Sequence, residues 1–132
     1  PKETLKDLAN DENLNVVLAV AGNTNTPEDT LDHLADSLDD EVRLKVAENK
    51  KTSAKTLAKL SKDKCICVRR AVAQNETTSQ DTLDELANDE AVSVRIAVAQ
   101  NINTRRRTLY VMKKDPNEKV SLSAMNNLVL KM

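Results

Sequence analysis

The phrase "AVAQN" occurs twice in the sequence, at residues 71–75 and again at residues 97–101. Its surroundings repeat as well, because "VRRAVAQNETTSQDTLDELANDE" (68–90) is closely similar to "VRIAVAQNINTRRRTLYVMKKDP" (94–116). The two copies lie 26 residues apart. Self-similarity at a fixed spacing of this length is typical of repeat proteins, in which one small structural unit is stacked many times.

The 26-residue step continues through the whole chain without an insertion. Threonine followed by leucine recurs at this step, as Thr4-Leu5, Thr30-Leu31, Thr56-Leu57, Thr82-Leu83 and Thr108-Leu109. Each unit also closes on an asparagine, and these are Asn23, Asn49, Asn75, Asn101 and Asn127. We therefore expect one domain of five units, which are residues 1–26, 27–52, 53–78, 79–104 and 105–132.

Each unit has the sequence signals of two helices. In the second unit, Thr26 is a good N-cap and Pro27 suits the first helical position, while Leu31 and Leu34 fall on one helical face. These signals predict a first helix of about ten residues. A second helix begins after Asp39 as its cap and runs to the closing asparagine. We expect that asparagine to end the helix in the left-handed conformation.

A strand is the alternative for the second element. The stretch "VSVRIAVAQN" (92–101) alternates apolar residues with the period of a strand, and Ile96, Val98 and Asn101 match the strand of ordinary leucine-rich repeats, whose asparagines form a ladder. Alanine at residue 99 and its equivalents favours helix instead. The leucine expected two positions after the asparagine is also missing, since Asn103 stands there. A second helix buried between neighbouring repeats explains the alternation equally well, so we predict an all-α fold.

Two stretches, "TPEDTLDHLADSLDDEVRLKVAENKKT" (26–52) and "TSQDTLDELANDEAVSVRIAVAQNINT" (78–104), resemble the variant leucine-rich repeat. This bacterial helical repeat is akin to HEAT and armadillo repeats. The resemblance rests on L-x-x-L-A-x-D followed at a fixed distance by V-R-x-x-V-A-x-N. It implies a right-handed α-α superhelix, or solenoid, of two-helix repeats, and it implies no single activity. The last unit departs most, with Arg105-Arg106-Arg107 at the usual helix start, and we expect it to form a terminal cap.

Composition restricts the function. Charged residues make up 31% of the chain and nearly balance, with 20 basic and 21 acidic residues, so the total favours neither nucleic acid nor an anionic membrane as a partner. Tyr110 is the only aromatic residue, and the core must therefore be aliphatic. No apolar run approaches the ~18 residues of a membrane helix, and no signal-peptide pattern is present. We expect a cytoplasmic protein.

Residue types that carry chemistry are few. Cys65 and Cys67 form C-x-C without a second pair, which is too few ligands for a four-ligand metal site. His33 is the only imidazole, and because its equivalents Asp7, Lys59 and Glu85 are polar, we expect it to be exposed. No second histidine, placed nucleophile or glycine-rich loop accompanies these residues. We therefore predict no catalytic residue, no metal and no cofactor.

Three arginines follow the valine that recurs in each unit. Asp11, Ser37, Asp63, Asp89 and Asp115 share another position, shortly after the first helix. If each arginine pairs with this position of the next unit, all three arginines pair with an aspartate. The first unit, which has Val17 in place of the arginine, then pairs with the second unit, which has Ser37 in place of the aspartate. Pairing each arginine with the aspartate position of its own unit, or with that of the preceding unit, leaves some charged residues without a partner. We predict an inter-repeat ladder, resembling that of HEAT repeats, of Arg43 with Asp63, Arg69 with Asp89 and Arg95 with Asp115.

The net charges of the units are −2, −4, +4, −4 and +5 in chain order, so acidic and basic units alternate from the second unit onward. Oppositely charged neighbours attract across the repeat junctions, whereas a nucleic-acid reader needs a continuous basic stripe. The lack of aromatic residues also removes base stacking. The candidate basic patch is Arg70, Arg105, Arg106 and Arg107. We expect a non-enzymatic binding scaffold for a protein or peptide partner, with a nucleic-acid-binding module as the alternative.

Overall fold

The computed structural model describes residues 2–132, with side chains from Thr4 onward. Over this range the protein has ten helices and no strand, so the all-α prediction is confirmed and the strand alternative is wrong. The helices are α1 (Lys2–Leu8), α2 (Leu14–Gly22), α3 (Glu28–Leu34), α4 (Asp40–Glu48), α5 (Ala54–Leu60), α6 (Ile66–Gln74), α7 (Gln80–Leu86), α8 (Val92–Gln100), α9 (Arg106–Met112) and α10 (Glu118–Leu130).

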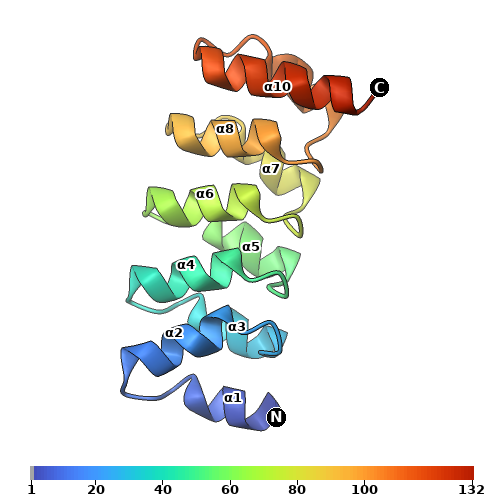
Figure 1. The fold of residues 1–132 in the computed structure, drawn as a ribbon. Coiled ribbons are helices and arrows are strands. Elements are labelled where there is room, and N and C mark those ends of the chain that lie inside the picture. The colour runs from blue at the N-terminus through green and yellow to red at the C-terminus, as the bar shows by residue number, and fades with distance from the viewer. Residues whose placement is uncertain (1) are drawn as a thin grey trace.

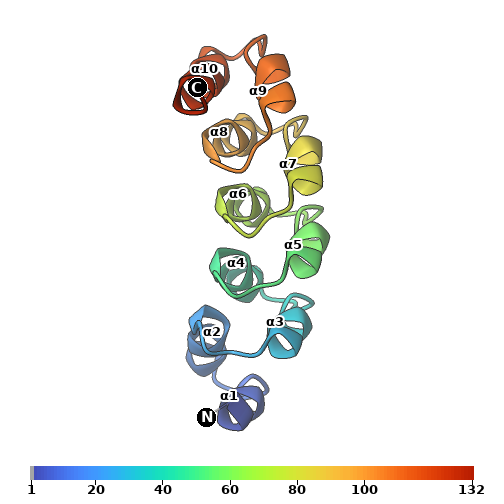
Figure 2. The same ribbon diagram turned by 90° about the vertical axis from the view of Figure 1, so that its right-hand side faces the viewer.

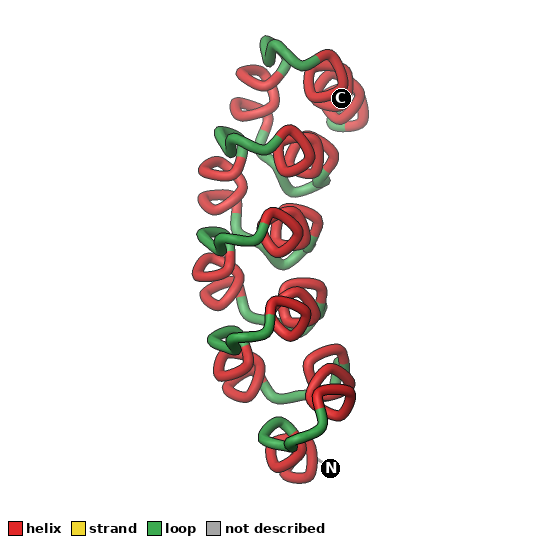
Figure 3. The backbone as a smooth tube through the Cα atoms, turned by 90° about the vertical axis from the view of Figure 1, so that its left-hand side faces the viewer, coloured by secondary structure: helices red, strands yellow, loops and turns green. Residues whose placement is uncertain are grey.

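The helices form a two-layer stack, with the odd-numbered helices in one layer and the even-numbered helices in the other (Figures 1 and 2). Each even helix packs against the even helices before and after it. Successive odd helices approach one another less closely. The stack is consequently bowed into a gentle arc, and the even helices lie on its concave side (Figures 2 and 3).

The core between the layers is aliphatic and repeats from unit to unit. Its largest fully buried side chains are the leucine of each threonine–leucine pair from α3 onward and the recurring valines of the even helices. They are Leu31, Leu57, Leu83, Leu109, Val20, Val42, Val46, Val68, Val72, Val94, Val98 and Val120. Burying each such side chain contributes about 1.5–3 kcal/mol, so the repeated pattern of the sequence is the pattern of the core.

The first helix of a unit begins later than predicted. Pro27, rather than Thr26, is the N-cap of α3, which has seven residues instead of about ten. The hydroxyl of Thr26 instead donates to the carbonyl of Val20, at 2.6 Å, near the end of the preceding helix. The same carbonyl also accepts the backbone amide of Asn23, at 3.1 Å, so the hydroxyl adds a second hydrogen bond at the helix terminus. The same bond occurs in three further units, from Thr52, Thr78 and Thr104.

The second helices begin as predicted and end differently. Asp39 caps α4 by accepting the amide of Glu41, at 2.9 Å, and Asn117 caps α10. The closing residue Asn49, however, has φ −72° and ψ 126°, and no non-glycine residue in 2–132 has a positive φ. The left-handed ending was therefore a wrong prediction. The helix ends in extended backbone, as α2 does at Asn23, with φ −82° and ψ 124°.

These asparagines form a ladder that ties each repeat to the one before it. Asn49 Nδ2 donates to the carbonyls of Ala21, at 2.8 Å, and Asn23, at 3.0 Å, while its Oδ1 accepts the amide of Lys51. The arrangement recurs at the next three junctions through Asn75, Asn101 and Asn127. The buried amide of Asn49 thus supplies a partner for the Ala21 carbonyl in the last turn of α2 and adds a second hydrogen bond to the Asn23 carbonyl, which also accepts the amide of Thr26.

Candidate functional site

The three ladder arginines are bound by aspartates of the following repeat. Arg43 Nε donates to Asp63 Oδ2 at 2.7 Å and Nη2 donates to Asp63 Oδ1 at 3.3 Å, so the pair is bidentate. Nη1 of the same guanidinium donates to the backbone carbonyl of Ser37, at 2.8 Å. The structure repeats this geometry from Arg69 to Asp89 and from Arg95 to Asp115. The forward pairing is therefore the one that the protein forms.

These arginines are structural, since their donors are already used. The side chains of Arg43 and Asp63 are only 9% and 8% exposed. The hydrogen bond to Asp63 raises the pKa of Arg43, and the bond to Asp89 raises that of Arg69. A guanidinium held by a carboxylate and a carbonyl has little capacity left for an external anion.

The candidate basic patch is divided between different surroundings. Arg105 is held by two acids of the preceding repeat, with Nη2 2.7 Å from Asp81 Oδ1 and Nε 3.2 Å from Asp84 Oδ2. Arg107 lies 3.8 Å from the same Asp84 carboxylate. Arg106 donates to the carbonyl of Lys131.

The fourth member of the patch, Arg70, is exposed on α6 in the even layer, whereas α9 belongs to the odd layer. Two of the four arginines thus neutralise acids of their own chain. The fold does not present the four side chains as one basic surface.

Charge complementarity between units is visible at their junctions. Lys59, from the basic third unit, lies 3.1 Å from Asp32 and 3.3 Å from Asp36 of the acidic second unit. The hydrogen bond from Lys59 lowers the pKa of Asp32. Arg105 makes the same kind of contact at the junction of the fourth and fifth units, so oppositely charged side chains meet at both junctions.

The cysteines and the histidine belong to different parts of the fold. Cys65 immediately precedes α6 and Cys67 lies in its first turn, with their sulfur atoms 2.9 Å apart and both thiols free. Their shared hydrogen bond lowers the pKa of Cys65 and raises that of Cys67. His33 is exposed on α3. Among residues 2–132 no group of three or more His, Cys, Asp or Glu side chains is arranged to hold a metal ion.

The concave surface carries an apolar row that the sequence analysis did not single out. One position of the even helices holds an apolar, half-buried or exposed residue in four of the five units, namely Leu18, Leu44, Ile96 and Leu122. Arg70 occupies this position in the middle unit. Beside the row, where the even helices begin, three further apolar side chains are exposed, and these are Leu14, Ile66 and Val92. Leu18, Leu44 and Ile96 also pack against the core, and the recurrence of an apolar residue at this position was the signal that could have revealed the row.

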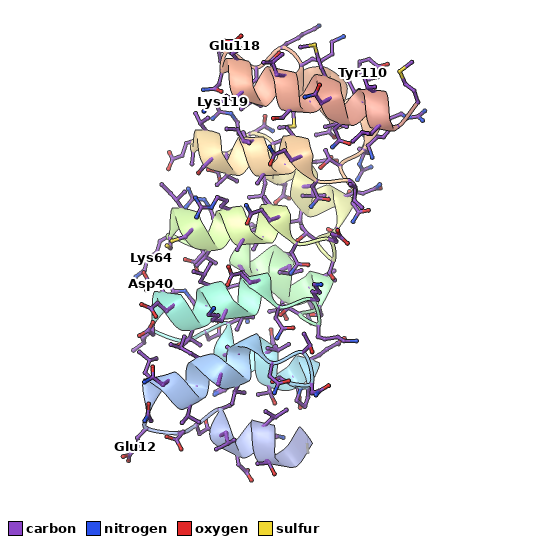
Figure 4. The ribbon with its side chains drawn as sticks, viewed as in Figure 1. Glu12, Asp40, Lys64, Tyr110, Glu118 and Lys119 are labelled. Carbon is purple, nitrogen blue, oxygen red and sulfur yellow. The ribbon has the colours of Figure 1, made fainter. Side chains whose placement is uncertain are left out.

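The edge at which the even helices begin is charged with mixed sign. Figure 4 shows Glu12, Asp40, Lys64, Glu118 and Lys119 along this edge. Acids and bases alternate there, so the edge forms no continuous basic stripe of the kind that binds successive phosphates. Within residues 2–132, no helix is long and apolar enough to cross a membrane.

Comparison with known proteins identifies the fold. Neither a protein-family model nor a curated protein matches the chain. A solved structure described as a leucine-rich repeat variant with a novel repetitive protein structural motif matches 96% of this chain, with a TM-score of 0.52 and 24% sequence identity. This chain spans 61% of that structure's length. At this identity the likeness speaks for the fold alone, and the chain therefore has the helical-repeat fold of the leucine-rich repeat variant.

Proposed function

We propose that the chain is a non-enzymatic scaffold whose concave surface binds another protein or a peptide. The observation that supports this most directly is the apolar row of the even helices, in which Leu122 is exposed and Leu18, Leu44 and Ile96 are half-buried against the core, beside the exposed Ile66 and Val92. Contiguous exposed apolar side chains with polar surroundings are typical of protein interaction sites. A stack of repeats also offers a long curved surface, because each repeat contacts only its neighbours.

A protein partner is favoured over a nucleic acid by the state of the basic residues. Arg43, Arg69, Arg95 and Arg105 all bind carboxylates of this chain at 2.7 to 2.9 Å. Salt-dependent affinity for nucleic acid requires free cations that replace counterions along the phosphates. The proposal excludes catalysis because the thiols beside α6 and the imidazole on α3 do not form one site.

The experiment is a pull-down with the immobilised chain followed by mass spectrometry, comparing two double variants. Ile66→Glu with Val92→Glu places two charges at neighbouring positions of the concave edge. Tyr110→Glu with Val111→Glu places two charges at exposed residues of α9, which belongs to the other layer. We expect partners captured by the unchanged chain to be lost from the first variant and kept by the second. Partners that survive both double variants, or that are lost equally from both, would contradict a concave binding surface.

A further inference from the structure

The junction between the second and third units is closed by a carboxylate. On α3, Asp32 accepts hydrogen bonds from the hydroxyl of Thr56 and the ammonium group of Lys59, each at 3.1 Å. Lys59 also lies 3.3 Å from Asp36, one turn further along. The helix that comes first thus supplies two acceptors, and α5 supplies two donors.

The preceding junction keeps the donors and lacks both acceptors. Twenty-six residues before Asp32 and Asp36, α1 and the turn that follows it carry Lys6 and Asn10. Twenty-six residues before the donors of α5, α3 carries Thr30 and His33. A lysine has donors only, and an asparagine amide offers two N–H donors besides its carbonyl. Donors therefore face donors across the groove between α1 and α3.

Thr30 also lacks the local partner of its equivalents, because Pro27 stands where Ser53 and Ser79 bond the hydroxyls of Thr56 and Thr82, each at 3.0 Å. Thr30 is 4% exposed, and its hydroxyl oxygen has no hydrogen-bond partner, although buried hydroxyls are ordinarily paired. It lines a cavity of about 330 Å³ between α1 and α3, whose lining residues are Lys6, Ala9, Asn10, Asp29, Thr30 and His33.

The acid in this lining does not replace the missing acceptors. Asp29 Oδ1 accepts the backbone amide of Thr30, at 2.8 Å, and Oδ2 is 4.0 Å from Lys6 Nζ. Because both side chains are about two-thirds exposed or more, at 67% and 72%, solvent weakens this ion pair. Lys6 is therefore free to turn towards another anion.

We propose that the groove between α1 and α3 binds a carboxylate supplied from outside the chain, in the place that the Asp32 carboxylate takes at the next junction. Lys6 provides the positive charge, and the Thr30 hydroxyl and the Asn10 amide donate hydrogen bonds. His33 lies on the exposed rim. The volume admits an Asp or Glu side chain of a bound peptide or a free small carboxylic acid. The site concerns one functional group at one junction, and it stands whether or not the concave surface binds a protein.

His33 makes the site directly observable, because it is the only imidazole of the chain and gives isolated ring signals by NMR. The full chain is titrated at fixed pH and ionic strength with acetate, and separately with an end-blocked Ala-Glu-Ala peptide. Acetamide and Ala-Gln-Ala are the neutral controls. We expect saturable shifts of the His33 ring and of the Lys6, Asn10 and Thr30 amides with the carboxylates only. Tighter binding of the peptide than of acetate would identify a protein side chain as the source, and the reverse a free acid.

Variants separate a built site from a general ionic effect. Lys6→Asp recreates the contact of the next junction and should weaken carboxylate binding at least tenfold, and Lys6→Gln is a second variant in case the first folds poorly. Thr30→Val should weaken binding, whereas Thr56→Val, at a junction that already has its carboxylate, should leave it unchanged. Shifts that stay linear with concentration, or that are equal in the unchanged chain and the Lys6 variants, would overturn the proposal.

Discussion

Arg69 Nε lies 2.8 Å from Asp89 Oδ2 in the next repeat, and Arg69 Nη1 lies 2.9 Å from the backbone carbonyl of Asp63 in its own repeat. Asp63 in turn binds Arg43 of the preceding repeat through its side chain. Each internal aspartate is therefore contacted by two arginines, one at the carboxylate and one at the carbonyl. The ladder is continuous, and it fixes the register between neighbouring repeats.

The two contacts of Arg69 predict an unequal coupling. Removing Arg69 leaves a nearly buried Asp89 carboxylate without its cation, and we expect Arg69→Ala to lower the free energy of unfolding by about 3 kcal/mol. A double-mutant cycle of Arg69→Ala with Asp89→Ala should give a coupling above about 1 kcal/mol. The cycle with Asp63→Ala should give much less, because Arg69 binds only the backbone of Asp63. Urea unfolding followed by circular dichroism measures both, and equal couplings would contradict the ladder.

The asparagine ladder predicts a strong effect of a nearly isosteric change. Asn75 Nδ2 donates to the carbonyls of Ala47, at 2.9 Å, and Asn49, at 3.0 Å. In Asn75→Asp a carboxylate would face these carbonyls, so the free energy of unfolding should fall by more than about 2 kcal/mol. The neighbouring change Gln74→Glu adds the same charge at an exposed position and should stay within about 0.5 kcal/mol. Thermal unfolding of the two variants measures both losses of stability. Equal losses would show that the added charge, and not the asparagine ladder, causes the effect.

Two equivalent threonines should respond differently to the same substitution. The Thr56 hydroxyl bonds Asp32, so Thr56→Val should cost about 1 kcal/mol and leave the Asp32 carboxylate with one donor fewer. The Thr30 hydroxyl has no partner in the structure, so Thr30→Val should be neutral or stabilising. The melting temperatures of the two variants, measured in a buffer without carboxylates, compare the two changes in stability. A loss at Thr30 as large as that at Thr56 would mean that the first junction already has an acceptor.

The fold could be predicted from the sequence because its repeats provide internal comparisons. Five copies of one pattern identified the core leucines and valines, and the matched absence of a charge at Val17 and Ser37 pointed to forward pairing of the arginines. The directions of short polar bonds were harder to predict. Thr26 and Asn49 stand at helix boundaries, where a side chain can form a hydrogen bond either with its own helix or with a neighbouring one. Which bond forms depends on which carbonyl the packing of the repeats brings within reach, and the sequence does not contain that distance.

The surroundings of the basic patch could not be predicted for a related reason. Arginines adjacent in sequence, such as Arg105 and Arg107, suggest a common surface, yet both side chains reach the Asp84 carboxylate of the preceding repeat. The acids that neutralise them lie more than 20 residues earlier in the chain. Stacking at the 26-residue step brings such distant groups together, so charge clusters in a repeat protein must be considered together with the adjacent units.

The state of these arginines predicts weak binding to nucleic acid. Filter binding of labelled duplex DNA should show no saturable affinity at 200 mM salt, and between 50 and 200 mM the logarithmic slope should stay below about 2, since acids are interspersed among the basic residues and no continuous basic stripe follows successive phosphates. Asp81→Ala with Asp84→Ala removes the acids that hold Arg105 and Arg107, so it should raise the affinity at low salt. Arg70→Ala should change little by itself. Tight binding by the unchanged chain, with a slope near that of about six phosphate contacts and a large loss in Arg70→Ala, would instead assign the surface around α6 to nucleic acid.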